Sequence, residues 1–480
     1  MLFNSFEFIL FLPIVFTLYW FVFKRLNRQN LFIVAASYFF YGWWDWRFLV
    51  LIAFTSLCSY YSGILLEKAE SKRTKQKWIS ASNIVLNLLI LGIFKYFNFF
   101  ADSFAALFES FGYNMDTVTL DILLPVGISF YTFQALSYSI DIYQHKIKPT
   151  RDPIAFFTFI SFFPQLVAGP IERATNLLPQ FQRGHTFDYS KAVDGMRQML
   201  WGFFKKMVVA DNCAVVVNNI WSGYQEESGG QLLLVAVLFT FQIYGDFSGY
   251  SDIAIGCARL FGIDLKRNFN FPYFSRDIAE FWRRWHISLT TWFRDYIYIP
   301  LGGSRVGKWK IFRNTMVIFL VSGLWHGGNW TFIIWGAYHA LLFLPLLLFG
   351  KNRKYTDTVA AGHLLPSFKE IVQMLLTFFL VVIGWIIFRA ENIGQAWDYL
   401  CQMFSSSLLT LPNHERKTTL IALIYSIMLL TVEWLQKDKQ HALFINDIKN
   451  KIVRWCIYCS LVIVIILFAG KVESFIYFQF

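Results

Sequence analysis

Two histidine-containing motifs have the residue types and spacing that could carry out chemistry. His326 lies in the motif SGLWHGGNW at residues 322–330, between two long apolar segments. An ionisable side chain in such a setting is costly and usually faces a cavity. Neutral imidazole near pH 7 can take the proton from an attacking hydroxyl, so we predict His326 as a general base. The alternative is a histidine that ties helices together. His339, in WGAYHA, is either a supporting residue or a packed helix residue.

The second motif is a basic, aromatic run, EFWRRWHISLTTWFRDY at residues 280–296. At helical spacing, Arg283, His286 and Thr290 share one face. Arginine binds phosphate groups bidentately, so the basic side chains of this run are predicted to hold the phosphates of a nucleotide-like cofactor. The arginines concerned are Arg283, Arg284 and Arg294. The alternative is an interfacial helix that contacts anionic lipid.

A third polar motif, YGDFSGYSD at residues 244–252, interrupts a largely apolar context. We predict that Asp246 and Ser248 line an interior route, because polar groups within membrane helices usually do. The order of residues is one position out of register with the GxSxG nucleophile elbow. The sequence also has no glycine-rich phosphate loop and no HExxH motif, so we predict neither a metal site nor an ATP-driven pump.

The elements that must position these residues are membrane helices. Of the 480 residues, 56% are hydrophobic and 15% are charged, which is more apolar material than one soluble core could bury. Apolar stretches of about 20 residues recur, and lipid-exposed irregular backbone would leave amide groups unpaired. The formal net charge of +12 comes from basic residues in short loops, which indicates topology rather than nucleic-acid binding. We predict an all-α polytopic membrane protein.

Basic and acidic loops alternate along the chain, which predicts about twelve crossings with both termini extracytoplasmic. Residues 6–23 are predicted to form a permanent first helix rather than a removable signal peptide. Residues 163–173 and 271–303 do not fit simple spans, and we predict re-entrant or interfacial segments that form a cytoplasmic funnel. The predicted single transmembrane domain, 1–480, comprises N-terminal helices in 1–120, a catalytic core in 121–350 and C-terminal helices in 351–480.

Three blocks together resemble the membrane-bound O-acyltransferase family. They are LPVGISFYTFQ at 124–134, the segment 268–303 with its RRWH, and LWHGGNW at 324–330. The block FPQLVAGPI at 163–171 and the terminal FIYFQF make the chain most similar to the bacterial branch that O-acetylates alginate and peptidoglycan. The resemblance covers nearly the whole chain.

The resemblance implies helices around a central tunnel, in which a cytoplasmic acyl donor meets an acceptor from the opposite side. The donor it implies is acetyl-CoA, with no permanently bound cofactor. His326 matches the family's catalytic histidine, and His286 matches a second polar position that orients the acyl carbonyl or the incoming group. A thioester donor also needs a hydrogen-bond donor for the developing oxyanion, and Asn329 or Trp325 is predicted to supply it.

The C-terminal sequence ESFIYFQF at 473–480 contains one phenol, Tyr477. We predict that Tyr477 accepts the acetyl group transiently and passes it to an extracytoplasmic SGNH-type acetyltransferase, which modifies a polysaccharide. The alternative is an aromatic anchor at the membrane interface or a docking peptide. The implied location is the bacterial cytoplasmic membrane, in contact with lipid. D-alanyl transfer from a carrier protein to teichoic acid shares these motifs, whereas a non-enzymatic transporter would show internal repeats that we do not find.

Overall fold

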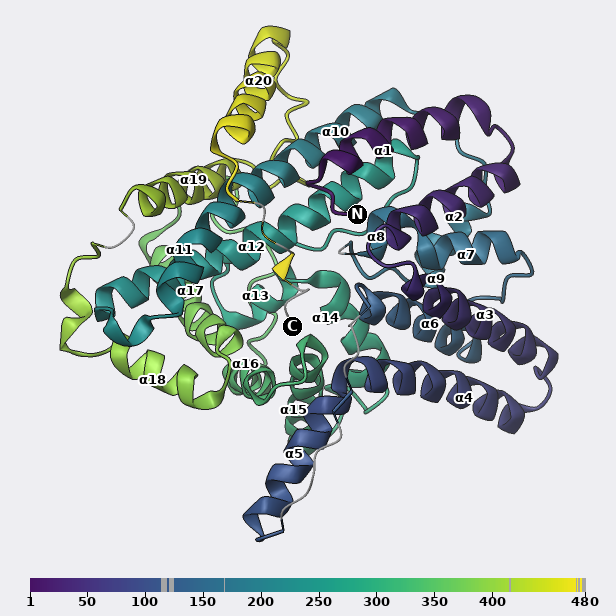
Figure 1. Cartoon of the computed structure of the whole chain (residues 1–480), viewed down its shortest axis with the longest axis horizontal. Helices are drawn as coiled ribbons and strands as arrows, with labels where there is room; N and C mark the ends of the chain where they lie inside the picture. Colours follow the sequence, from purple (N-terminus) through teal and green to yellow (C-terminus); the bar gives the residue numbers. More distant parts are fainter. Residues whose placement is uncertain are drawn as a thin grey trace. The chain divides into compact units, whose positions relative to one another are not determined.

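The structure is a computed structural model that describes residues 1–113, 119–120, 125–167, 169–413, 416–471, 473 and 475–476. These residues form helices and connecting turns, without a β-strand among them (Figure 1). Seven described helical segments are long and apolar enough to cross a membrane. They are Arg47–Lys68, Arg73–Ser110, Gly229–Leu260, Trp330–Leu348, Phe368–Arg389, Arg416–Leu435 and Lys451–Phe468. The chain is therefore a multi-pass membrane protein. The twelve crossings, the single domain, the tunnel and the orientation of the termini remain predictions.

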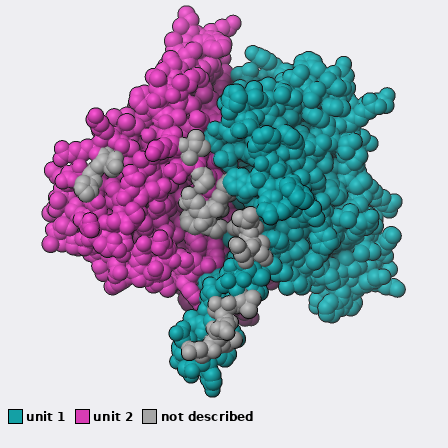
Figure 2. Space-filling view, viewed as in Figure 1, with its two compact units in different colours: residues 1–196, 254–266 teal, residues 197–253, 267–480 magenta. Residues whose placement is uncertain are grey.

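Two compact units make up the chain, residues 1–196 with 254–266 and residues 197–253 with 267–480 (Figure 2). Helices α10 (Tyr189–Phe203) and α12 (Gly229–Leu260) have residues in both units. The other elements of the first unit are α1 (Phe6–Thr17), η1 (Leu18–Val22), α2 (Leu26–Gly42), α3 (Arg47–Lys68), α4 (Arg73–Leu91), η2 (Gly92–Tyr96), α5 (Phe97–Ser110), α6 (Ile128–Tyr143), α7 (Pro153–Ser161), α8 (Phe163–Leu166) and α9 (Ala174–Phe181).

Helix α6 forms the centre of the first unit, where it packs against both α3 and α4. Nearly all of its residues are buried, as expected for a helix that is surrounded by other helices. Helix α7 begins at Pro153, and the carboxylate of Asp152 accepts hydrogen bonds from the backbone N–H groups of Ile154 and Ala155 at 2.9 and 3.1 Å. This N-cap and the proline in the first turn start the helix at that position.

The second unit contains His286, His326 and His339. Its remaining elements are η3 (Phe204–Ala210), α11 (Asp211–Trp221), η4 (Tyr224–Glu226), η5 (Pro272–Phe274), α13 (Ile278–Arg284), α14 (Ile287–Phe293), η6 (Arg294–Tyr298), α15 (Lys308–His326), α16 (Trp330–Leu348), α17 (Phe368–Arg389), α18 (Ile393–Met403), η7 (Ser406–Leu409), α19 (Arg416–Leu435) and α20 (Lys451–Phe468). Residues 271–303 form only short helices and turns, none of them long enough to cross a bilayer.

Helices α15 and α16 form a tightly packed antiparallel pair in the second unit. Gly323 approaches the carbonyl oxygen of Phe332 so closely that a Cβ atom would collide with it, and Gly336 approaches the carbonyl oxygen of Phe319 in the same way. Small residues at such contacts allow two helix backbones to approach closely. The packing places His326, the last residue of α15, near the start of α16.

Candidate active site

His286 lies at the break between α13 and α14, in the left-handed backbone region with φ 42° and ψ 54°. A non-glycine residue in this conformation is uncommon and often marks a functional position. The backbone N–H of Ile287 donates to the carbonyl oxygen of Asn268 at 2.8 Å, which holds the break in place. The break also corrects the prediction of one continuous helical face, because Arg283 and Thr290 lie on different helices.

Asn268 fixes the tautomer of His286. The Oδ1 atom of Asn268 accepts from the backbone N–H of Ser288 at 3.3 Å and from its hydroxyl at 2.8 Å, while Nδ2 donates to the Ser251 hydroxyl at 3.0 Å. These contacts orient the amide, so Oδ1 is the atom that faces His286 Nδ1 at 3.0 Å. Since an amide oxygen only accepts, Nδ1 must carry the hydrogen. The Nε2 atom of neutral His286 is then an acceptor.

The environment of His286 keeps its ring neutral. The residue is 1% exposed, and Nε2 has no hydrogen-bond partner among the residues that the structure describes. Burial lowers the pKa of His286 to about 3, because the charged imidazolium is poorly solvated there. An oriented, neutral imidazole with an open Nε2 can receive a hydrogen bond from an incoming hydroxyl or amide.

His326 and His286 contact the same indole ring. The ring centroid of Trp325 lies 5.9 Å from that of His286 and 4.9 Å from that of His326. His326 is 4% exposed and also packs edge-on against Trp335 at 5.1 Å and Phe388 at 5.3 Å. The structure therefore brings the two predicted histidines together with Trp325 in one aromatic cluster.

His339 lies on α16, fully buried behind this cluster. Its ring lies 5.0 Å from Trp335 and 5.0 Å from Trp282, and neither ring nitrogen has a hydrogen-bond partner among the described residues. Gly384 on α17 leaves the space for this ring, since a Cβ atom there would lie 2.7 Å from Nε2. Trp335 therefore connects His339 with His326 through direct ring contacts.

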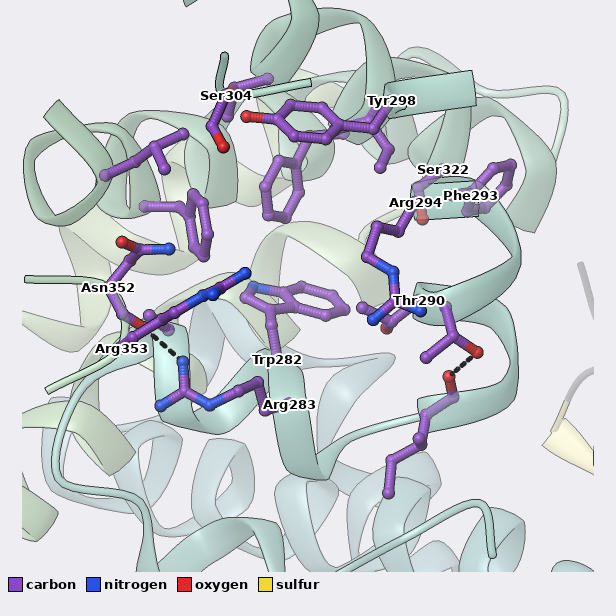
Figure 3. Close-up of a pocket in the computed structure, with 18 residues that line it drawn as sticks. Trp282, Arg283, Thr290, Phe293, Arg294, Tyr298, Ser304, Ser322, Asn352 and Arg353 are labelled. Carbon is purple, nitrogen blue, oxygen red and sulfur yellow. Dashed lines mark hydrogen bonds between the residues drawn. The ribbon is translucent and has the colours of Figure 1, made fainter. Parts of the chain in front are cut away.

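A cavity of about 400 Å³ lies within the second unit (Figure 3). It is lined by Ala279, Trp282, Arg283, Ile287, Thr290, Thr291, Phe293, Arg294, Tyr298, Ser304, Thr315, Ile318, Phe319, Ser322, Phe343, Leu347, Asn352 and Arg353. Figure 3 shows the Trp282 indole between Arg283 and Arg353 on one side and Arg294 on the other. The lining thus combines three guanidinium groups with hydroxyl and apolar side chains.

The three arginines are held differently. The Arg283 guanidinium donates to the carbonyl oxygens of Asn352 and, at 2.6 Å, Tyr355, which fixes its position. Arg294 pairs with Asp295 through Nε at 2.6 Å. Arg353 forms no ion pair with a carboxylate in the described part of the chain. Guanidinium groups next to apolar side chains suit an anionic ligand with a hydrocarbon portion. The arginines would bind its anionic groups, and the apolar side chains would contact its hydrocarbon portion.

Two lining residues connect this cavity with the histidines. Ile287 directly follows His286, and Ser322 lies one helical turn before His326 on α15. The arginine-lined cavity and the two histidines therefore lie within the same unit.

Arg284, which was also predicted to line the donor site, is not part of the cavity lining. Its Nη2 lies 2.8 Å from the Glu280 carboxylate, which is fully buried and also pairs with Arg276 at 3.1 Å. The Arg284 guanidinium further donates to the carbonyl oxygen of Asp357 at 3.0 Å. These contacts give Arg284 a structural role in holding α13.

Three other predicted residues have their polar groups occupied by contacts within the fold. Asn329 caps α16 by accepting from the N–H of Thr331 at 3.0 Å, and its amide donates to the carbonyl oxygen of Glu391 at 2.7 Å. The Ser248 hydroxyl donates to a backbone carbonyl of its own helix at 2.6 Å. Asp246 pairs with Lys206 at 2.9 Å. Tyr477 lies outside the described residues.

Sequence reasoning missed Asn268 and Arg353. Asn268 begins the 268–303 block, and no local pattern indicates that its amide orients a residue so far along the chain. Arg353 belongs to a basic loop that we interpreted only as a topology signal. In the described part of the chain, no three His, Cys, Asp or Glu residues are grouped to hold a metal ion.

A family model described as MBOAT, membrane-bound O-acyltransferase family, matches residues 38–387. The chain belongs to this family. It is therefore an O-acyltransferase, and the match spans the helices that carry His286, His326 and the cavity.

Relatives of this O-acyltransferase extend the similarity beyond the family model. The probable alginate O-acetylase AlgI of Pseudomonas aeruginosa is 43% identical over 84% of this chain and 75% of its own length. The peptidoglycan O-acetyltransferase of Helicobacter pylori is 31% identical over 100% of this chain and 98% of its own. The teichoic acid D-alanyltransferase of Bacillus subtilis is 30% identical over 55% of this chain and 69% of its own.

Proposed function

We propose that this O-acyltransferase takes an acetyl group from cytoplasmic acetyl-CoA and delivers it across the bacterial cytoplasmic membrane for O-acetylation of an extracytoplasmic polysaccharide. The observation that supports this most directly is the cavity, which places Arg283, Arg294 and Arg353 in the same site as residues adjoining His286 and His326. The similarity to the alginate O-acetylase of P. aeruginosa and the peptidoglycan O-acetyltransferase of H. pylori supports an acetyl group and a polysaccharide acceptor.

Acetyl-CoA matches the chemistry of the cavity. Its phosphates would be bound by the guanidinium groups, of which Arg353 carries no competing carboxylate among the described residues. Its pantetheine arm would lie along apolar side chains such as Phe319 and Leu347. The thioester would then point toward the two histidines.

The reaction needs a base, because the acceptor hydroxyl is a weak nucleophile until its proton is removed. In our proposal His326 takes this proton as the hydroxyl oxygen attacks the thioester carbonyl. The new C–O bond forms, the C–S bond breaks, and the departing thiolate receives the proton from His326. His286 Nε2 can only accept in the tautomer that Asn268 fixes, so it orients the incoming group rather than the acyl carbonyl.

The acetyl group must then reach a polysaccharide. We propose that the Tyr477 phenol is the first acceptor and that a separate extracytoplasmic SGNH-type acetyltransferase receives the acetyl ester from it. Acetyl transfer is favoured over D-alanyl transfer because the H. pylori acetyltransferase matches 100% of this chain, whereas the B. subtilis D-alanyltransferase matches 55%.

The test uses purified protein in lipid nanodiscs with radiolabelled acetyl-CoA. Wild type should cleave the thioester, and His326→Ala and His286→Ala should lose about 100-fold or more of this activity. His363→Ala is the matched control, since His363 is exposed and outside the cavity lining. Label retained on wild type but not on Tyr477→Phe would support the relay. If folded wild type leaves acetyl-CoA intact, the proposed donor is wrong.

A further inference from the structure

A buried lysine in the second unit binds the C-terminal part of the chain. Lys206, on η3, is 1% exposed, and its ammonium lies 2.8 Å from Oδ1 of Asp211 and 2.9 Å from Oδ1 of Asp246. The ammonium also donates a hydrogen bond to the backbone carbonyl oxygen of Glu473 at 3.0 Å. Its hydrogen bonds are thus to Asp211 and to this backbone oxygen, while Asp246 Oδ1 faces it as an ion pair without a hydrogen bond.

The same C-terminal residues make a second contact with this group. The backbone N–H of Ile476 donates to Oδ2 of Asp246 at 2.6 Å. The ring of Phe475 packs against Tyr250 at 4.5 Å and Phe247 at 5.9 Å, and both Phe475 and Ile476 are buried. Glu473 and Ile476 are thus held through their backbone atoms, and Phe475 is held through its aromatic ring.

Close helix packing brings the charged residues together. A Cβ atom on Gly249 of α12 would lie 2.8 Å from the carbonyl oxygen of Gly202 on α10, and one on Gly202 would lie 2.7 Å from that of Gly249. Only glycines permit this approach without a shift of the backbone. Lys206 follows in a π-helical turn, a geometry that is frequent at functional sites, and faces Asp246 from there.

The charged groups around Lys206 leave hydrogen-bonding positions that the backbone of a peptide segment can fill. Two carboxylates face one ammonium, so Asp246 still needs a hydrogen-bond donor for Oδ2, and the N–H of Ile476 supplies it. Without Glu473 and Ile476, one ammonium hydrogen and one carboxylate oxygen would lose their partners in a buried setting.

The bound segment adjoins the candidate active site. Phe247, which contacts Phe475, also packs edge-on against the His286 ring with centroids 4.6 Å apart. One aromatic ring therefore separates the C-terminal segment from the imidazole that we assign to orienting the incoming group.

We infer that Lys206, Asp211 and Asp246 form a docking site for the described residues of the chain's own C-terminal segment, Glu473, Phe475 and Ile476, and that this docking positions the residues that follow for acyl transfer. The polar contacts of the site are to backbone atoms of the segment. The site therefore fixes the position of the segment and does not select its side chains by polar contacts. The docking contacts do not depend on which reaction the protein catalyses. The role of docking in acyl transfer rests on the proposed function.

Trypsin tests the docking directly, because exposed Lys471 lies just before the segment. Cleavage after Lys471 releases residues 472–480, which mass spectrometry quantifies. Asp246→Leu removes the Oδ2 acceptor and the ion pair with Lys206 and should speed this release about 10- to 100-fold, with Asp246→Asn intermediate. Asp252→Asn is the matched control, since Asp252 lies on the same helix but pairs with Lys205 at 2.5 Å. Release at the wild-type rate from a folded Asp246→Leu protein would overturn the inference.

A second experiment tests the role of docking in transfer. The full-length chain, with and without Asp246→Leu, is incubated with radiolabelled acetyl-CoA, and the label on residues 472–480 after trypsin cleavage is measured together with thioester cleavage. Asp246→Leu should lower this labelling about tenfold. Equal labelling of the two chains would refute positioning by this site. Absence of thioester cleavage by the full-length chain would instead refute the proposed donor.

Discussion

The amide oxygen of Asn268 lies 3.0 Å from Nδ1 of His286, and the same oxygen accepts from both donors of Ser288. This arrangement leaves one tautomer for the histidine and directs its free acceptor, Nε2, away from the amide. Residues that orient an imidazole in this way influence its chemistry without touching the substrate.

Asn268→Ala should therefore lower kcat about 10- to 100-fold, because His286 then samples the tautomer with hydrogen on Nε2. The KM for acetyl-CoA should change little, since Asn268 is not part of the cavity lining. Steady-state thioester cleavage in nanodiscs measures both values. Ser288→Ala, which keeps the Asn268 to His286 contact, should have a smaller effect on kcat. A rise in KM alone would contradict the tautomer argument.

Arg353→Ala and Arg294→Ala should each raise the KM for acetyl-CoA about tenfold, with kcat little changed, because each removes a guanidinium from the cavity. Arg305→Ala is the matched control, as an exposed arginine of the same region outside the cavity lining. Initial rates over a range of donor concentrations give both parameters.

Acetyl-pantetheine tests whether the arginines bind the phosphates of the donor, since it keeps the thioester and lacks the nucleotide. If the arginines bind the phosphates, Arg353→Ala and wild type should have similar KM values for this shorter donor. An equal loss with both donors would show that the arginine supports the cavity wall and does not contact phosphate.

Much of the helical fold could be predicted from the sequence, because long apolar runs have few stable alternatives in a bilayer. Segments such as Trp330–Leu348 and Phe368–Arg389 follow directly from length and hydropathy. The break at His286 could not be predicted in this way. The run EFWRRWHISLTTWF has the composition of one amphipathic helix, and only the distant contacts of Asn268 hold His286 in its left-handed conformation.

The candidate site was predictable in its residue types but not in its contacts. The rarity of ionisable groups in apolar sequence indicated His326, whereas His286 was indicated by the basic, aromatic run and by the family resemblance. Neither signal could distinguish Arg283, which lines the cavity, from its neighbour Arg284, which pairs with Glu280. Consecutive helical residues point in different directions, and only the packing of α13 decides which of the two faces a ligand.

Arg284→Met should therefore reduce stability and leave donor binding intact. The substitution removes one of the two arginines that neutralise fully buried Glu280, and breaking a buried ion pair from one side costs about 3–5 kcal/mol. We expect a lower Tm in nanodiscs and an unchanged KM for acetyl-CoA in the protein that remains folded. A raised KM with an unchanged Tm would place Arg284 in the donor site instead.

Because His286 is buried, the stability of the folded protein should fall as the pH is lowered. Its pKa is lowered to about 3 in the folded protein, whereas an unfolded histidine titrates near about 6.5. As the pH falls below about 6.5, the unfolded state takes up the proton first, so the folded state loses stability by up to about 1.4 kcal/mol per pH unit. The contribution is complete above about pH 6.5 and declines toward about pH 3.

Thermal unfolding of wild type and His286→Gln between about pH 4 and about pH 8 measures this contribution, since glutamine does not titrate there. The Tm of wild type should fall more steeply on acidification than that of the variant, and the two curves should run parallel above about pH 7. Over the same range His286 stays neutral in the folded protein, so any acid loss of activity arises from another group. Parallel curves throughout would mean that His286 is solvated and charges freely in the folded state.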